Sequence, residues 1–229
     1  GKSAFAHKGG VHINAMLKNP QTYEHILPET VGNTRRFLTS ELSGKSNIMI
    51  KAQALDASLT KESPKTRLIH ELVQKLENEG YQFEAAEASF ELLVHKTLKK
   101  HKPFFDVLGY KSVVISEGNQ APVSEATVHL RVKGKEELMA AQGDGPVNAL
   151  DSALRKALIP YYPELAKMHL SDFKVRVLDQ KSGTAAKVRV FVESNDDNGS
   201  WTTVGISENV IEASWRALLD SIEYKLLKR

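Results

Sequence analysis

Cysteine is absent from the 229-residue sequence, and so are long apolar runs. A chain without cysteine forms no disulfide and no thiolate metal site, which fits a reducing compartment. No apolar stretch approaches the roughly 20 residues that span a bilayer, and no signal peptide is recognisable. We therefore expect a cytoplasmic protein with no membrane partner.

An excess of charge of one sign is also missing. The 31 Lys and Arg residues and 28 Asp and Glu residues give a formal net charge of +3, too little to favour nucleic acid. Single-strand binders interleave cations with aromatic residues on which bases stack. Four cations lie on predicted strand faces with Phe191 as the only strand aromatic near them: His129, Arg131, Lys187 and Arg189. We expect a solvated face there and no nucleic-acid partner.

The sequence also has no initiator methionine and opens almost directly on a motif-like stretch. We expect a longer protein of which an N-terminal portion precedes Gly1. The 229 residues suffice for one large domain or two modest ones. An apolar fraction of 41% is ordinary for a globular protein.

Residues 1–55 show no sustained apolar period. Pro20, Pro28, Gly32 and Gly44 interrupt this part, so only short helices and loops are predicted. A long polar segment of this kind is typical of a linker or a mobile functional element.

Residues 56–104 show a clear helical period instead. Ser63 is a predicted N-cap with Pro64 at the first helical position, and Gly80 ends that helix. A second helix follows and is stopped by Pro103. This part is predicted to be a small helical subdomain.

From residue 105 the apolar period changes from about 3.6 to about 2, as expected for strands. Three blocks of this part recur about 60 residues later, each copy giving three strands and then a helix. The sequence therefore predicts an α+β fold that ends in a duplicated βββα domain over residues 105–229, with repeats at about 105–165 and 166–229. The matched blocks are "YKSVVISE" at 110–117 with "FKVRVLDQ" at 173–180, "ATVHLRV" at 126–132 with "AKVRVFV" at 186–192, and "NALDSALRKAL" at 148–158 with "NVIEASWRALL" at 209–219.

Strand alternation predicts which side of each sheet is buried. Val128, Leu130 and Val132 point one way in the first copy, and the intervening cations point to solvent. The equivalent inward residues of the second copy are Val188, Val190 and Val192. Since neither copy alone has much core, the two are expected to pack together.

The N-terminal stretch "AFAHKGGVHINAMLK", residues 4–18, contains two histidines. His7 and His12 are five positions apart, without an H-x-H or H-E-x-x-H pattern and without a carboxylate close in sequence, so no self-contained metal site is expected. The pair Gly9 and Gly10 lets the backbone bend sharply and could present His12 into a cleft. A packed histidine beside a turn is the alternative for both.

A second candidate is "QGDGPVNAL", residues 142–150. Gly143 and Gly145 flank Asp144, and Pro146 begins a helix whose free N–H groups and dipole favour a carboxylate. Asp144 could pair with an ammonium group, so an α-amino acid would suit this turn. A tight strand-to-helix turn without ligand is the alternative.

The corresponding turn of the second copy is "GISEN" at 205–209. Here we expect Ser207 to cap the helix and Glu208 to complement its dipole.

Three of these motifs carry a resemblance to a known family. "AFAHKGGVHINAMLK", "GDGPVNALDSALRKAL" and "GISENVIEASWRALLDSI" resemble the C-terminal part of the 2-isopropylmalate synthase and homocitrate synthase family. "SGTAAKVRVFVES" and "NVIEASWRALLDSIEYKLL" look most like its citramalate synthase branch. The resemblance covers essentially the whole chain.

The family architecture is a catalytic (β/α)8 barrel, two small linker subdomains and a duplicated βββα regulatory domain. It implies linker subdomain I at 1–55, an active-site lid, linker subdomain II at 56–104 and the regulatory, dimerising domain at 105–229. It also implies that the barrel, with its divalent metal (Mg, Mn or Zn), lies outside this chain. No cofactor is expected within the chain itself, which should be inactive alone.

The same resemblance assigns roles to two sites. His12 occupies the position of the G-x-H histidine that completes the partner subunit's active site in a homodimer, with a role in proton transfer or orientation; Tyr23 is a weaker candidate. The family condenses acetyl-CoA with an α-keto acid, and the regulatory domain binds the end-product amino acid. The effector is expected near Asp144, Gly145, Pro146 and Val147, between the two repeats or at their dimer contact.

Three hypotheses follow. The first is the regulatory and dimerisation portion of an acyltransferase that makes citramalate from acetyl-CoA and pyruvate for isoleucine biosynthesis, with feedback inhibition by isoleucine. The second replaces pyruvate with α-ketoisovalerate and isoleucine with leucine, as in a 2-isopropylmalate synthase. The third is a structural dimerisation module that senses nothing.

Overall fold

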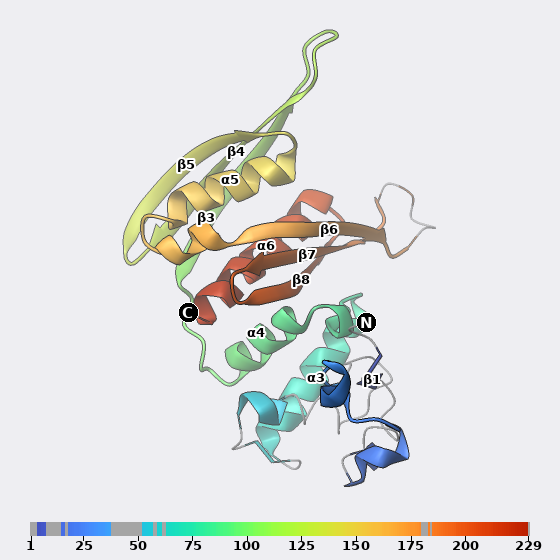
Figure 1. Ribbon diagram of the computed structural model, residues 1–229. Coiled ribbons are helices and arrows are strands. Elements are labelled where there is room, and N and C mark those ends of the chain that lie inside the picture. Colours follow the sequence, from blue (N-terminus) through green and yellow to red (C-terminus); the bar gives the residue numbers. More distant parts are fainter. Residues whose placement is uncertain are drawn as a thin grey trace. The chain divides into compact units, whose positions relative to one another are not determined.

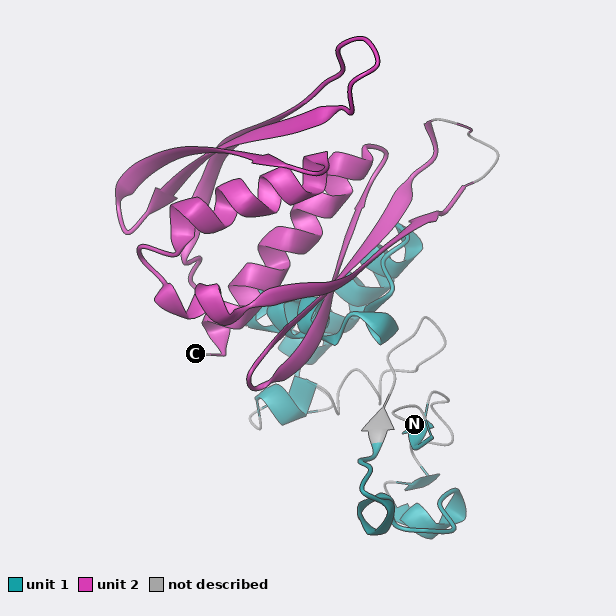
Figure 2. Cartoon of the chain, turned by 45° about the horizontal axis from the view of Figure 1, so that its top comes forward, with its two compact units in different colours: residues 1–100 teal, residues 101–229 magenta. Residues whose placement is uncertain are grey.

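The computed structural model describes residues 4–7, 15, 16, 18–37, 52–56, 59, 60, 63–179, 183 and 185–228. The chain forms two compact units, Gly1–Lys100 and His101–Arg229 (Figure 2). His12 lies outside the described residues. None of the described helices is both long and apolar enough to span a membrane.

The first unit begins with a very short parallel pairing. Strand β1 (Ala6–His7) pairs with β2 (Arg36–Phe37), and two single-turn helices, η1 (Pro20–Thr22) and η2 (Pro28–Val31), lie between them in sequence. Prolines start both turns, and Gly32 ends the second with a φ of 64°, a left-handed conformation that glycine adopts at little cost. Within residues 18–37 the structure thus shows only single-turn helices and a two-residue strand.

Two longer helices complete the first unit. Helix α3 (Pro64–Asn78) has Ser63 as its N-cap, whose hydroxyl accepts a hydrogen bond from the Lys65 N–H at 3.3 Å. The short η3 (Phe83–Ala85) leads into α4 (Glu87–Thr97). Both predicted helices are confirmed, and they share one apolar core. Its buried members are Ala52, Leu59, Ile69, Val73, Phe83, Phe90, Val94 and Leu98.

The second unit holds two three-stranded antiparallel sheets, each followed by a helix (Figure 1). The order is β3 (Phe105–Ile115), β4 (Val123–Val132), β5 (Lys135–Gly143) and α5 (Pro146–Leu158). After η4 (Pro163–Lys167) it repeats as β6 (His169–Val177), β7 (Val188–Asp196), β8 (Gly199–Ser207) and α6 (Val210–Leu227). The predicted α+β fold with a duplicated βββα unit is thus confirmed.

The strand registers show how closely the copies match. Each first strand has a break in register at the same place, between Val107 and Gly109 in β3 and between Leu170 and Asp172 in β6, 63 positions later. The hairpins at 133–134 and 197–198 are 64 apart. In the first of them Lys133 and Gly134 both have positive φ, as the favoured two-residue turn requires.

This register corrects the spacing taken from sequence similarity. The matched blocks placed the second strands 60 apart and the helices 61 apart, whereas the hairpins and helix starts are 64 apart. The predicted inward face of β4 and β7 survives, because a shift of four residues preserves the alternation of a strand. Val128, Leu130, Val132, Val190 and Val192 are fully buried, and Val188 is half-buried.

The two repeats pack together into a shared core, as predicted. Trp215, Ile222 and Leu226 of α6 belong to the same buried cluster as Leu150, Leu154 and Leu158 of α5. The ring of Tyr110 on β3 also lies over Trp215, with centroids 4.9 Å apart. Fully burying one such large apolar side chain stabilises a fold by about 1.5–3 kcal/mol, so the repeats depend on each other.

Each helix covers only part of its sheet. Helix α5 packs mainly on β4 and β5, and α6 on β7 and β8. On the strands β3 and β6, which form sheet edges, apolar residues that share the inward face with buried partners remain exposed. We call this set the edge-strand apolar residues: Val107, Tyr110, Val114, Leu170, Phe173, Val175 and Val177, each 36–55% exposed.

Candidate functional site

The turn between β5 and α5 carries the predicted effector residues Asp144, Gly145, Pro146 and Val147. Gly145 is the N-cap of α5 with extended backbone, and no side chain caps the helix. The Asp144 N–H donates to the Asn148 side-chain oxygen at 3.2 Å. The first turn of α5 contains no acidic residue, so nothing in it offsets the positive end of the helix dipole.

The corresponding turn before α6 is closed by its own side chains. Asn209 caps the helix and accepts from the N–H groups of Ile211 at 2.9 Å and Glu212 at 3.3 Å. The Ser207 hydroxyl donates to Glu212 at 2.9 Å and accepts from the Asn209 N–H at 3.1 Å. Arg216 holds the other Glu212 oxygen. The Ser207 hydrogen bond and, to a lesser extent, the Arg216 charge hold the pKa of Glu212 below its usual value, although burial raises it.

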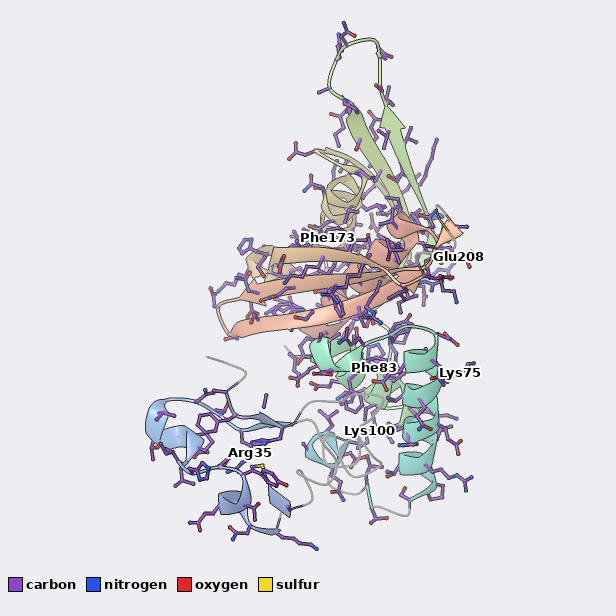
Figure 3. The ribbon with its side chains drawn as sticks, turned by 90° about the vertical axis from the view of Figure 1, so that its right-hand side faces the viewer. Arg35, Lys75, Phe83, Lys100, Phe173 and Glu208 are labelled. Atoms are coloured by element: carbon purple, nitrogen blue, oxygen red, sulfur yellow. The ribbon has the colours of Figure 1, made fainter. Side chains whose placement is uncertain are left out.

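This geometry corrects the assignment made for the second turn. Ser207 does not cap α6, because the helix begins only at Val210 and its N-cap is Asn209. The carboxylate of the first turn is that of Glu212, not that of Glu208, which is exposed before the cap (Figure 3). The repeats therefore differ at equivalent places: the start of α6 is capped and acidic, and the start of α5 is neither.

The α5 turn also lies where the two copies meet. The Val147 side chain packs against a cluster from the second repeat, namely Val190, Val192, Ala213, Ala217 and Leu218. A Cβ added to Gly145 would meet no atom within 4 Å, whereas one added to Gly143 would lie 2.5 Å from the Ala149 nitrogen. Open space thus adjoins Gly145, and Asp144 is exposed beside it. Uncapped N–H groups, a carboxylate and an apolar contact are the groups that recognise an aliphatic α-amino acid.

A second polar cluster lies in the first unit and was missed by sequence reasoning. The Glu24 side chain is only 2% exposed and accepts from Arg35 Nε at 3.0 Å and His7 Nε2 at 3.1 Å. The Arg35 hydrogen bonds hold the pKa of Glu24 below its usual value against the opposing effect of burial, and His7 lowers it further. The carboxylate is 17 positions from His7, so local spacing could not reveal the pair. Tyr23, next to it, is 43% exposed.

The described residues contain no group of three or more His, Asp or Glu side chains arranged to hold a metal ion. The divalent metal that the family resemblance implies is expected in the catalytic barrel, outside this chain. The basic side chains on the outer face of β4 contact a carboxylate. His129 lies 3.1 Å and Arg131 lies 3.0 Å from Glu136 on the neighbouring strand. Arg189 lies over the Phe191 ring.

Comparison with known proteins matches both units. Residues 84–226 match the family model of the LeuA allosteric (dimerisation) domain, and residues 1–80 match the homocitrate synthase post-HMGL domain-like model. The whole chain is 54% identical to an (R)-citramalate synthase of Geobacter sulfurreducens and 51% identical to one of Aquifex aeolicus. It is 29% identical to a 2-isopropylmalate synthase of Methanocaldococcus jannaschii.

The chain spans about two fifths of these relatives, 43% of the first two and 42% of the third. The matched models cover the irregular N-terminal part, the two helices and the duplicated βββα unit, which is the order found in the structure. The first of these matches covers 143 residues, more than half of the chain. The chain therefore belongs to the LeuA allosteric (dimerisation) domain family, and its N-terminal part resembles the homocitrate synthase post-HMGL domain.

Proposed function

We propose that this chain is the regulatory and dimerisation portion of a citramalate synthase, following the catalytic domain of a longer cytoplasmic acyltransferase. The observation that carries the proposal is the match of the duplicated βββα unit to an allosteric dimerisation domain, in a chain 54% identical to an (R)-citramalate synthase. Allostery requires a binding site distinct from the reacting centre and two states with different affinity.

The complete enzyme, on this proposal, condenses acetyl-CoA with pyruvate. A base removes a proton from the acetyl methyl group, the resulting nucleophile attacks the keto carbonyl, and thioester hydrolysis drives the reaction forward. The metal and its ligands belong to the proposed barrel outside this chain. His12, in the partner's active site, would assist proton transfer or orientation.

Isoleucine is the proposed effector, seated at Asp144–Val147. Its carboxylate would accept from N–H groups at the uncapped start of α5, its ammonium group would face Asp144, and its side chain would approach Val147. The contrast with α6 supports this assignment, because there the chain's own Asn209 and Glu212 fill the equivalent place.

A homodimer is the proposed assembly. Exposed contiguous apolar residues on a folded unit mark interaction surfaces, and the edge-strand apolar residues lie on the inward sides of both sheets. A second copy that covers β3 and β6 would bury them. The description of the matched family as a dimerisation domain supports this arrangement.

Isothermal titration calorimetry with isoleucine, leucine and valine tests the proposal on this chain directly. We expect binding heat with isoleucine and weaker affinity for the other two. A preference for leucine would favour the 2-isopropylmalate synthase alternative, for which the Methanocaldococcus relative is the supporting observation. No heat with any of the three, and a melting temperature that ignores all of them, would leave only a structural dimerisation module.

A further inference from the structure

Residues 101–104, which open the second unit, are held by side chains of both repeats. The N–H group of Phe104 donates to the carboxylate of Glu223 on α6 at 3.4 Å. Its carbonyl oxygen accepts from the Tyr162 hydroxyl at 2.7 Å. Tyr162 is itself tied to the end of α5, because its N–H group donates to the Leu158 carbonyl oxygen at 2.9 Å. The backbone of one residue is thus bonded to groups that move with α5 and with α6.

His101 adds a buried polar pair at the same place. Its Nε2 lies 2.8 Å from the second oxygen of Glu223, and the two side chains are 3% and 10% exposed. The Phe104 ring meets the rings of His101 and Tyr162 edge to face, with centroids 5.9 Å and 6.1 Å away. A buried pair adds little stability over apolar residues. It does favour one arrangement, because separating polar groups that stay buried is costly.

The turn proposed to bind the effector joins the same two repeats. Val147 packs against a buried cluster that includes three residues of α6, namely Ala213, Ala217 and Leu218. Leu218 and Glu223 are five residues apart on one helix, about 8 Å along its axis, and α5 and α6 contact each other (Figure 1). Packed helices shift against each other largely as rigid bodies. A ligand that moves α5 against α6 at Val147 therefore also moves Tyr162 against Glu223.

We propose that residues 101–104 transmit effector binding out of the second unit. An amino acid at Asp144–Val147 would shift α5 against α6, and Tyr162 and Glu223 would pass this shift to the backbone that they hold. The chain leaves the second unit at this point, since Lys100 is the last residue of the first unit. The inference rests on the proposed function, in which isoleucine inhibits the synthase from the α5 turn. Tyr162 and Glu223 are then positioning residues for regulation, outside the proposed effector site.

The first test compares two neighbouring tyrosines in the complete synthase. Tyr162→Phe removes the hydroxyl that holds Phe104 and keeps the ring. We expect kcat without isoleucine and the dissociation constant of isoleucine to stay near wild type. The factor by which saturating isoleucine lowers kcat/KM for pyruvate should fall by about fivefold or more. The matched control is Tyr161→Phe, because the Tyr161 hydroxyl donates to Glu137 within the first repeat. This control should be inhibited like the wild type.

The second test removes the other attachment of the segment and keeps the inference falsifiable should Tyr162→Phe fold poorly. Glu223→Gln keeps the size of the side chain and removes its charge, and it should relieve inhibition in the same way. Its control is Asp196→Asn, whose carboxylate is 5% exposed and pairs with Lys225, joining α6 to β7 within the second repeat. Asp196→Asn should lower thermal stability and retain inhibition. Because both attachments hold one segment, the effects of Tyr162→Phe and Glu223→Gln should not add.

Hydrogen exchange followed by mass spectrometry observes the segment itself. With isoleucine at about a hundred times its dissociation constant, exchange at residues 101–104 should slow by about tenfold or more, because separating the repeats would release the ligand. The slowing should be smaller in Tyr162→Phe. Peptides from α3 in the first unit are the internal control and should exchange at the same rate with and without isoleucine.

Three results would overturn the inference. They are full inhibition of both Tyr162→Phe and Glu223→Gln, equal relief of inhibition in these variants and their controls, and unchanged exchange at residues 101–104 when isoleucine is bound. A wild-type synthase that binds none of isoleucine, leucine and valine would instead refute the proposed function, before any variant is compared.

Discussion

At the scale of single residues, the starts of α5 and α6 show how capping groups change the surroundings of an exposed carboxylate. Asp144 and Glu208 occupy equivalent positions before α5 and α6, 64 residues apart, and both are exposed. Only the turn of Asp144 leads into a helix without a cap or an acidic first turn. Removal of the negative charge should therefore affect effector binding differently at the two positions.

We expect Asp144→Asn to weaken isoleucine binding by about 1.5–3 kcal/mol, the contribution of a hydrogen bond to a charged group. Glu208→Gln should leave the affinity unchanged. Calorimetric titration of both variants at one salt concentration measures the difference. Equal affinities of the two variants would place the effector elsewhere.

Glu24 gives a prediction about pH at the same scale. Its folded pKa is lowered from the ordinary value of 4.5, so ionised Glu24 contributes stability that is present above pH 4.5 and is lost as the pH falls through the folded pKa. Glu24→Gln should lower the free energy of unfolding by about 3 kcal/mol at neutral pH.

The difference between wild type and Glu24→Gln should shrink in acid, because wild-type Glu24 then becomes neutral as well. Thermal unfolding followed by far-UV circular dichroism at neutral pH and well below pH 4.5 checks this. A difference that stays constant with pH would show that charge at Glu24 does not stabilise the fold.

At the scale of elements, the contact between strand and helix depends on glycine at one position. A Cβ on Gly205 of β8 would lie 2.0 Å from the Ala213 carbonyl oxygen of α6 and 2.9 Å from the Ala217 nitrogen. These are backbone atoms, so relief requires the helix to move away from the sheet. The close approach of α6 to β8 is therefore possible only without a side chain there.

Gly205→Ala should destabilise the second unit by about 1–3 kcal/mol or more. Gly145→Ala is the control, because its backbone is extended and nothing lies within 4 Å of the added Cβ. Both tryptophans, Trp201 and Trp215, lie in the second unit, so urea unfolding followed by tryptophan fluorescence reports on this unit alone. Equal midpoints for the two variants would contradict the predicted clash.

Elements with strong local signals could be predicted from the sequence. Pro64 and Ser63 gave the start of α3, and the alternation of Val128, Leu130 and Val132 gave a strand with one buried face. The predicted N-cap of α6 was wrong by two residues. Ser207 and Asn209 are both good N-caps, and only the length of β8, which includes Ser207, decides between them. The Glu24 cluster could not be foreseen, since its partners meet through loop geometry.

The candidate site, too, could be predicted only in part from the sequence. The turn at Asp144–Val147 is recognisable from its Gly-Asp-Gly-Pro order, but its contact with Val190 and Val192 depends on how the repeats pack. Packing between copies is set by side-chain shape over the whole core, which no local pattern encodes. His12 stays a prediction from the family resemblance.

At the scale of the whole molecule, the edge-strand apolar residues predict how chains associate. Val175 is 43% exposed in the middle of β6. Burying a charge there in an interface without a partner is costly, so Val175→Glu should convert a dimer into monomers. The control is Leu68→Glu, on α3 of the first unit, where the leucine is 52% exposed.

Sedimentation velocity over a range of concentrations measures this change, with circular dichroism to verify folding. We expect the dissociation constant of Val175→Glu to rise by at least about a hundredfold, equivalent to roughly 2.7 kcal/mol. Leu68→Glu should sediment like the wild type. If Val175→Glu still forms a dimer, the interface does not involve β6.

The unlike starts of α5 and α6 have a consequence for stoichiometry. A duplicated unit offers two equivalent places per chain, yet one of them is occupied permanently by Asn209 and Glu212. Saturation should thus be reached at one amino acid per chain rather than two. On the proposed function, only the start of α5 is left open to a metabolite, because side chains of the protein itself fill the equivalent place at α6.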